Sequence, residues 1–436
     1  MSFKEKAADV MGHVAYRITN QKYIMAIKQA FVTLMPIIIT GAFAVLVANM
    51  IMSPETGLAH FEIFRFLAEL QPIMKAINYA TLNFLTIGAV FLIGIELGKI
   101  NGHKSLFPGL MALISFISVI PTTLLLEVDG SMREVVDVLA RQFSDPKSLF
   151  LGMIIAIVSV EIFCKLTEVK WLQIKMPDSV PSNVATSFSS LFPSIITITI
   201  ISSFGFAFHR VTGIYLHEAV YNVVQRPLES VVQGLPGILT LMFVAQFFWV
   251  IGIHGNQMIK PIREPLLLGS IAVNMTAFQE GKEIPNIITM PFWDVYMSIG
   301  GSGVTIGLLV AIFIAGRREE MRSIAKLSSG PGLFNINEPV IFGLPVMLNP
   351  VMAIPFIVTP LVTGTIGYIA TATGFAGKAV VMVPWTTPPL VNAWLSTAGS
   401  MGAVITQLIC IVVAVFIYLP FVLLSNRKPE AAPDSE

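Results

Sequence analysis

Long apolar stretches with few charges alternate with short charged segments along most of the chain. In the first half they cover residues 29–54, 78–96, 106–126, 149–166 and 187–208. In the second half they cover residues 234–253, 265–279, 295–316, 352–372 and 401–424. A helix needs roughly 20 such residues to cross the hydrocarbon core of a bilayer. The pattern predicts an all-α polytopic membrane protein with about ten transmembrane helices.

The segments between these stretches differ in character. Residues 127–145 are acidic and mildly amphipathic, which is typical of an outer loop. Two apolar pieces, residues 284–290 and 379–395, are interrupted by prolines and too short to span comfortably. Non-helical backbone at membrane depth is tolerated where it is buried in protein or lines a wet cavity. We therefore expect both pieces to form re-entrant hairpins.

Residues 214–233 have a different pattern, with valines and a leucine at helical spacing and charged or amide side chains between them. This pattern predicts an amphipathic interfacial helix that connects two halves, although a plain connector is the alternative. The predicted divisions are an N-terminal transmembrane half (1–213), the connecting helix (214–233), a C-terminal half with the re-entrant segments (234–426) and a cytoplasmic tail (427–436).

Basic residues indicate the orientation. The first 28 residues are basic and amphipathic, and Arg317, Arg318, Arg427 and Lys428 follow the ends of apolar stretches. Lysine and arginine mark the cytoplasmic side, so both termini are expected inside the cell, which requires an even number of spans.

Composition limits the classes of protein that fit the sequence. The chain of 436 residues is 55% hydrophobic and 12% charged, with a mean hydropathy of +0.78 and a net charge of +1. These values fit a membrane protein and give no reason to expect a nucleic-acid partner. The six histidines lack metal-ligand spacing, and there is no nucleotide-binding P-loop or dinucleotide fingerprint. We expect no cofactor, no metal and no disulfide, because Cys164 and Cys410 both lie in apolar windows.

The stretch around Glu338 is the strongest candidate site. Between Pro339 and Asn426 the only charged residue is Lys378, so Glu338 stands where a basic loop meets a long apolar region. Glycines and prolines break the backbone there, and Asn335 and Asn337 add amide groups. An ionisable residue at such a boundary is a functional hypothesis by default. The alternatives are a solvated loop carboxylate and asparagines that only form turns.

A second candidate ends the stretch at residues 234–253. His254 is followed by Gly255, Asn256 and Gln257, so an apolar helix delivers an imidazole and two amides beside a glycine. A lone histidine is more often structural, but the clustering with amides favours a binding role.

Aromatic residues beside polar groups suggest a sugar. Asp294 follows Trp293 and precedes Tyr296 by two positions, and Trp385 is followed by Asn392. Aromatic rings stack on the apolar face of a pyranose while carboxylates and amides bind its hydroxyls. Interfacial aromatic anchoring is the alternative for the tryptophans.

Two segments of the second half of the chain also resemble each other in sequence. Residues 262–269 and 336–343 both fit I-x-E-P-x-x-x-G, and each is followed by a Pro-Trp or Pro-Phe-Trp piece and then by a Gly-Ser break, at 301–303 and 399–402. A parallel repeat with corresponding broken segments would point to the substrate site.

With Asn337-Glu338-Pro339 and His254-Gly255-Asn256, the sequence resembles the membrane IIC component of phosphoenolpyruvate-dependent sugar phosphotransferase systems, in the lactose/cellobiose/diacetylchitobiose branch. The likeness covers nearly the whole chain. It implies a multi-pass homodimer in the bacterial cytoplasmic (inner) membrane, with dimer contacts in the first half and one disaccharide in the second. Glu338 and His254 match the binding glutamate and histidine of the family.

The resemblance implies inward translocation of a β-linked disaccharide, diacetylchitobiose or cellobiose, coupled to its phosphorylation. In this branch the donor is a phosphocysteine on a separate cytoplasmic IIB protein, so whether this chain itself counts as an enzyme is left open. Glu338 and His254 are assigned to hold the reacting hydroxyl, either one as general base. Asn256, Gln257, Asp294, Asn335, Asn337, Trp385 and Asn392 are the further sugar-binding candidates. The alternative function is a proton- or sodium-coupled secondary sugar transporter.

Overall fold

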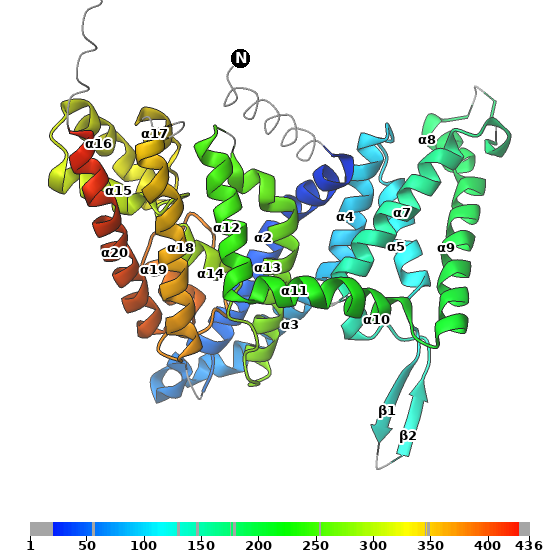
Figure 1. Cartoon of the computed structure of the whole chain (residues 1–436). Helices are drawn as coiled ribbons and strands as arrows, with labels where there is room; N and C mark the ends of the chain where they lie inside the picture. The colour runs from blue at the N-terminus through cyan, green and yellow to red at the C-terminus, as the bar shows by residue number, and fades with distance from the viewer. Residues whose placement is uncertain are drawn as a thin grey trace, which may run out of the picture. The chain divides into compact units, whose positions relative to one another are not determined.

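The structure, a computed structural model, describes residues 21–54, 57–128, 131–144, 148–174, 176–177, 180–252, 254–344, 346 and 349–426. Helices form most of the described chain, as the sequence predicts (Figure 1). Contacts within the chain divide it into two compact units. We call residues 16–44 and 72–230 the N-terminal unit, and residues 1–15, 45–71 and 231–436 the C-terminal unit. The predicted lead-in up to residue 20 and the tail at 427–436 lie outside the described residues.

The boundary between the units falls between Ser230 and Val231, inside the predicted connecting segment. Residues 45–71 belong with the C-terminal unit although they lie early in the sequence. The predicted functions of the two halves, dimerisation and sugar binding, stay predictions.

The N-terminal unit contains most of the first half of the chain. Its elements are α2 (Lys22–Leu46), α3 (Gln71–Leu82), α4 (Leu85–Ile100), α5 (Phe107–Ser118), β1 (Leu124–Val128), β2 (Ser131–Val135), α6 (Arg141–Ser144), α7 (Leu149–Thr167), a short 3-10 helix η5 (Lys170–Leu172), α8 (Ser182–Ser189), α9 (Leu191–Thr212), α10 (Leu216–Val220), a π-helical turn η6 (Tyr221–Gln225) and α11 (Arg226–Gln233). Helices α2, α3 and α11 contain the positions where the chain passes between the units.

Helices α4, α5 and α7 pack on one another in the N-terminal unit. Gly94 on α4 lies so close to α5 that an added Cβ would stand 2.7 Å from the Cβ of Ala112 and 2.8 Å from the carbonyl oxygen of Pro108. Small residues allow such close approach, which is how apolar helices associate in a membrane. Substitution of Gly94 would force these two helices apart.

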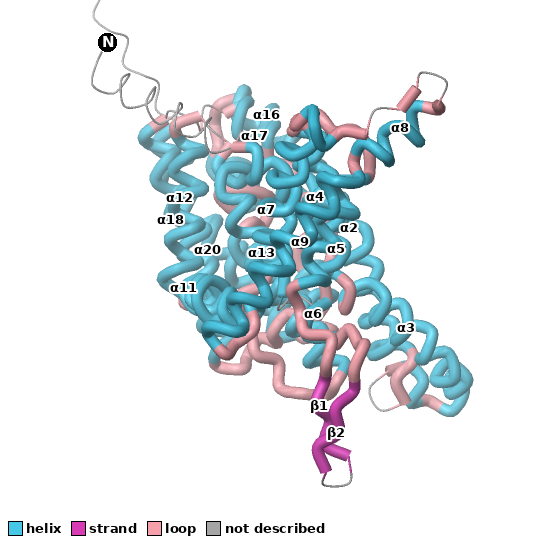
Figure 2. Tube along the Cα trace, turned by 90° about the vertical axis from the view of Figure 1, so that its right-hand side faces the viewer, coloured by secondary structure: helices cyan, strands magenta, loops and turns pink. Residues whose placement is uncertain are grey.

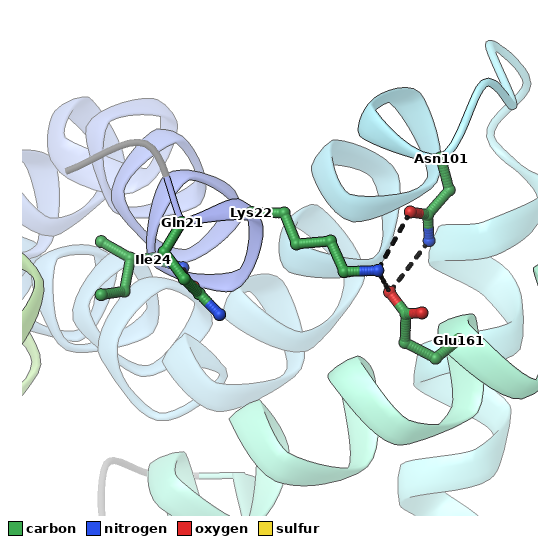
Figure 3. Close-up of polar contacts among 5 residues, drawn as sticks. All are labelled: Gln21, Lys22, Ile24, Asn101 and Glu161. Carbon is green, nitrogen blue, oxygen red and sulfur yellow. Dashed lines mark hydrogen bonds and ion pairs between the residues drawn. The ribbon is translucent and has the colours of Figure 1, made fainter. Parts of the chain in front are cut away.

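A polar cluster joins three helices of this unit (Figure 3). The Lys22 ammonium of α2 lies 2.6 Å from Oε1 of Glu161 on α7. Asn101, which follows α4, donates from Nδ2 to the same carboxylate oxygen at 3.1 Å. Gln21 caps the start of α2, since its Oε1 accepts from the backbone N–H of Ile24 at 2.9 Å. The Glu161 side chain is only 17% exposed, so the cluster links the start of α2, the end of α4 and α7 through a largely buried carboxylate.

A β-hairpin corrects the all-α prediction. β1 and β2 form a hairpin (Figure 2). The strands pair antiparallel, with Leu124 opposite Val135 and Val128 opposite Ser131. The sequence analysis placed residues 106–126 in a span and 127–145 in an outer loop, but α5 ends at Ser118. The sequence carries an Asp-Gly pair at positions 129 and 130, a strong hairpin signal that the periodicity argument passed over.

The C-terminal unit is built mainly from the second half of the chain. Its elements are a π-helical turn η1 (Val47–Ile51), two 3-10 helices η2 (Leu58–His60) and η3 (Glu62–Leu70), then α12 (Leu235–Val250), α13 (Gly255–Gln279), α14 (Met290–Phe292), a π-helical turn η7 (Trp293–Met297), α15 (Thr305–Ala315), α16 (Glu319–Leu333), α17 (Glu338–Gly343), α18 (Pro350–Ala372), α19 (Val391–Ser396) and α20 (Met401–Ser425).

One apolar core holds most of these helices together. It contains buried side chains from α12, α15, α16, α17, α18 and α20, among them Trp249, Leu308, Met321, Val340, Phe356 and Tyr418. The core places the N-terminal turn of α17 and the C-terminal end of α12 around the loop that precedes α15.

Among the described residues, six helices are long and apolar enough to cross a membrane, or seven if the bent pair 216–233 and 235–250 forms one span. The predicted span at 295–316 is wrong, because helix α15 begins only at Thr305. Gly300, Gly301 and Gly303 adopt left-handed φ angles there, which a continuing helix cannot accommodate. The predicted span at 265–279 is instead the second half of the 25-residue helix α13.

The two pieces predicted as re-entrant are irregular and lie against α13. Asn274, fully buried on α13, donates from Nδ2 to the carbonyl oxygens of Asn286 at 2.7 Å and Ala379 at 2.9 Å. Its Oδ1 accepts from the backbone N–H of Asn286 at 2.9 Å. Lys378 donates to the carbonyl oxygen of Ile284 at 2.6 Å. Thus one asparagine satisfies backbone groups of both pieces, and the only charged residue of the region 339–426 joins them directly.

Candidate functional site

The loop at residues 300–304, between η7 and α15, is the centre of the candidate site. Gly300, Gly301 and Gly303 have φ angles of +73°, +100° and +78°, and Val304 has a φ of +55°. A β-branched residue in this region is a genuine outlier, which the surrounding structure must impose. The hydroxyl of Tyr418 on α20 donates to the carbonyl oxygen of Gly303 at 2.7 Å.

Asn335 holds this loop from the segment before α17. Its Oδ1 accepts from the backbone N–H of Gly300 at 2.8 Å. Its Nδ2 donates to the carbonyl oxygens of Trp385 at 2.7 Å and Thr387 at 3.0 Å. Asn335 itself has a φ of +62°, a conformation that asparagine adopts more readily than most residues. One side chain therefore joins the loop to the second irregular piece.

Asn337 and Glu338 come next. Asn337 is buried, and its Nδ2 donates to the carbonyl oxygen of Ser302 at 2.7 Å. Gly301 makes room for it, because an added Cβ would lie 2.5 Å from Cγ of Asn337. Glu338 is the first residue of α17, so its carboxylate lies at the positive end of the helix dipole. The residue is exposed.

The segment that begins at His254 reaches the same loop through Asn256 of α13. His254 precedes the helix, and its Nδ1 accepts from the backbone N–H of Gln257 at 3.4 Å. The imidazole ring lies 4.2 Å from the ring of Trp249, centroid to centroid. Asn256 donates from Nδ2 to Oγ of Ser302 at 2.8 Å. Oδ1 of Asn256 and Oε1 of Gln257 are buried without a hydrogen-bond partner among the described residues.

Asp294 lies in a second, charged group. It is buried in η7, and its Oδ2 has no hydrogen-bond partner among the described residues. The guanidinium of buried Arg263 lies 4.8 Å from the centre of the Trp293 ring, within range for a cation–π interaction. Glu264 is also buried, and its Oε1 forms an ion pair with Nζ of Lys260 at 3.2 Å. The sequence analysis did not select Arg263 and Glu264, although both belong to the first Glu-Pro motif.

Asn392 and Trp385 are placed differently. Asn392 is buried, and its Oδ1 accepts from Nε2 of Gln407 at 3.0 Å. The same Nε2 donates to the carbonyl oxygen of Val295, so α20 ties Asn392 to the segment that carries Asp294. The Trp385 side chain is 52% exposed, while its carbonyl is used by Asn335.

Most of the predicted residues therefore fall into two groups. Asn256, Asn335, Asn337 and the Trp385 backbone meet around the loop at 300–304. Gln407 ties Asn392 to the carbonyl of Val295, the residue after Asp294. Sequence reasoning missed Gln407 and Ser302. Gln407 could have been found as the one amide in the apolar stretch 401–424, and Ser302 was noticed only as part of a Gly-Ser break.

A small hollow beside the second group has room for about one water molecule. It is lined by Ile287, Pro291, Phe292, Val295, Tyr296, Thr371, Gly377, Ala379, Ser396 and Thr397. Among the described residues, no group of three or more His, Cys, Asp or Glu side chains is placed to hold a metal ion.

Broken helices, buried polar groups and apolar spans together define a membrane transport protein. The profile of the family described as "Phosphotransferase system, EIIC" matches residues 28–360. The lichenan permease IIC component of Bacillus subtilis is 34% identical over 94% of this chain and 90% of the relative. The cellobiose-specific EIIC component of Geobacillus stearothermophilus is 30% identical over 97% of this chain and 94% of that protein.

A solved structure agrees with these sequence relatives. The transporter ChbC, the IIC component of the N,N'-diacetylchitobiose-specific phosphotransferase system, matches with a TM-score of 0.87 and 32% identity over 95% of both chains. The chain therefore belongs to the EIIC family of the phosphotransferase system. It is a sugar permease component of that system, and the predicted family is confirmed.

Proposed function

We propose that this chain carries a β-linked disaccharide, diacetylchitobiose or cellobiose, across the bacterial cytoplasmic membrane while a separate IIB protein phosphorylates it. The observation that carries the proposal is the meeting of the His254 and Glu338 segments on one loop. Asn256 follows His254 by two positions and Asn337 directly precedes Glu338, and both asparagines donate to Ser302. The names of the relatives support the substrate, since cellobiose and diacetylchitobiose are both β-linked disaccharides.

Glu338 and His254 hold the 6-hydroxyl of the sugar in the proposed mechanism. The bond between sulfur and phosphorus of the IIB phosphocysteine breaks as a bond forms between that phosphorus and the hydroxyl oxygen. The thiolate leaves, and the hydroxyl proton passes to the Glu338 carboxylate or the His254 imidazole. Phosphoryl transfer depends mainly on positioning and charge stabilisation, so these groups need not act covalently. An exposed Glu338 fits a reaction in which a soluble donor reaches the sugar.

The remaining predicted residues contribute unequally. Gln257 and Asp294 each have a buried oxygen without a partner among the described residues, and Asn392 has an Nδ2 in the same state. Buried polar atoms are normally hydrogen-bonded, so these atoms are suited to sugar hydroxyls. Trp385 offers an exposed ring for stacking. Asn335 donates both amide hydrogens to backbone carbonyls. Only one lone pair on Oδ1 of Asn335 remains to accept from a sugar hydroxyl.

We further propose about ten spans with both termini in the cytoplasm and a homodimer formed through residues 1–213. Among the described residues, the six long apolar helices, the bent pair and the shorter apolar helices α5 and α15 account for nine of these spans. Membership of the phosphotransferase family removes the reason to consider an ion-coupled secondary transporter.

The test is uptake into liposomes that contain the purified protein. Labelled cellobiose and diacetylchitobiose are supplied outside, with or without phosphorylated IIB inside, for the wild type and Glu338→Gln. Sugar phosphate is expected only with IIB and at a much lower rate in the variant. Uptake driven by a proton or sodium gradient without IIB would refute the proposal, and equal phosphorylation by both proteins would remove Glu338 from the mechanism.

A further inference from the structure

Ser302 joins two segments that are far apart in the sequence. Its Oγ accepts from Nδ2 of Asn256 at 2.8 Å, and its carbonyl oxygen accepts from Nδ2 of Asn337 at 2.7 Å. The residue is 4% exposed and lies between two glycines with left-handed φ angles. A single buried residue therefore connects the start of α13 with the start of α17.

Each of these asparagines stands beside a residue that the proposed mechanism uses. Asn256 lies in the first turn of α13, two positions after the His254 cap, and Asn337 is the cap of α17, which begins with Glu338. A shift of either amide would carry the neighbouring imidazole or carboxylate with it, because at most one residue separates the members of each pair. The distance between the two reactive groups is thus set through Ser302.

The loop that carries Ser302 is held from several directions by other parts of the C-terminal unit. Asn335 accepts from Gly300, Tyr418 donates to Gly303, and Gly303 packs so tightly on Phe356 that an added Cβ would lie 2.3 Å from its ring. The left-handed φ of Val304 shows that this surrounding packing dictates the conformation of the loop. A loop that is held in this way can position the segments that contact it.

We propose that Ser302 is the positioning residue that sets the spacing of His254 and Glu338 around the sugar hydroxyl. The inference rests on the proposed function and assigns a residue to it that does not itself bind the sugar. Ser302 acts through Asn256 by its side chain and through Asn337 by its backbone. Removal of the hydroxyl should therefore disturb the His254 side of the site and leave the Glu338 side in place.

Ser302→Ala tests the proposal, with Ser328→Ala as the matched control. Ser328 is a buried serine of the same unit whose hydroxyl has no hydrogen-bond partner among the described residues. For each variant we would measure the dissociation constant for cellobiose and diacetylchitobiose, the kcat of phosphorylation by phosphorylated IIB, and the melting temperature. Ser302→Ala is expected to lower kcat about tenfold and to weaken binding about threefold, since catalysis depends more steeply on geometry than binding does.

A double-mutant cycle separates positioning from a general loss of structure. If Ser302 acts through Asn256, Ser302→Ala should have almost no further effect on kcat in an Asn256→Ala background. Effects on kcat that simply multiply, or a Ser302→Ala protein with the kcat of Ser328→Ala, would overturn the inference while the wild type still phosphorylates sugar. A wild type that forms no sugar phosphate with IIB would instead refute the proposed function, and the inference with it.

Discussion

Asn335→Gly tests the hydrogen bonds of the side chain that joins the loop at 300–304 to the segment around Trp385. Glycine adopts the φ of +62° without strain, so the substitution removes the amide and leaves the backbone conformation accessible. Asn335→Ala removes the same amide but places a Cβ in the left-handed region. The pair of variants therefore separates the hydrogen bonds from the backbone conformation.

The magnitude follows from the bonds that are lost. Asn335 makes three hydrogen bonds, to Gly300, Trp385 and Thr387, and it is 7% exposed. A typical bond contributes about 1 kcal/mol net, so Asn335→Gly should destabilise the C-terminal unit by about 3 kcal/mol. Asn335→Ala should add about 1 kcal/mol for the left-handed conformation.

The assay is thermal unfolding of detergent-purified protein, followed by intrinsic tryptophan fluorescence, with and without cellobiose. A loss of about 3 kcal/mol corresponds to a fall in melting temperature of roughly 6–12 °C for a unit of this size. A melting temperature for Asn335→Gly within about one degree of the wild type would refute the reasoning, because it would mean that the three bonds contribute nothing. Equal melting temperatures for the glycine and alanine variants would refute the part assigned to φ.

Three further changes test other contacts. Gly301→Ala should lower the rate of IIB-dependent phosphorylation about tenfold, because its Cβ displaces Asn337, while a normal rate would show that Asn337 need not stay on Ser302. Glu161→Gln should lower the stability of the N-terminal unit by about 1 kcal/mol in a melting experiment. The double variant Lys22→Met, Glu161→Leu should recover part of the stability that is lost. Asn274→Ala should destabilise the C-terminal unit by about 3 kcal/mol and speed hydrogen exchange of the Asn286 amide, whereas unchanged exchange would contradict the contact seen here.

Much of the fold could be predicted because apolar length and basic flanks are local properties. Helices α7, α9, α18 and α20 fall where the apolar stretches predict them. The predictions failed where backbone conformation decides the outcome, as at the glycines before α15, whose left-handed φ angles break an otherwise uninterrupted apolar stretch. They also failed at β1 and β2, where hydropathy does not distinguish a strand from a helix.

The structure brings several of the predicted residues together, but the sequence did not indicate what their side chains contact. Asn256, Asn335 and Asn337 were selected because amides suit sugar hydroxyls, yet each has an amide nitrogen that donates to the protein itself. An asparagine carries the same donors and acceptors whether its partner is a ligand or a backbone, so the sequence cannot assign the partner. The irregular backbone at 300–304 needs such partners, because buried carbonyl and amide groups outside helices must still be satisfied. The amides that mark a site in the sequence are thus partly required by the broken helices that create it. The buried atoms without a partner among the described residues, on Asn256, Gln257, Asp294 and Asn392, are the better guide to a sugar site.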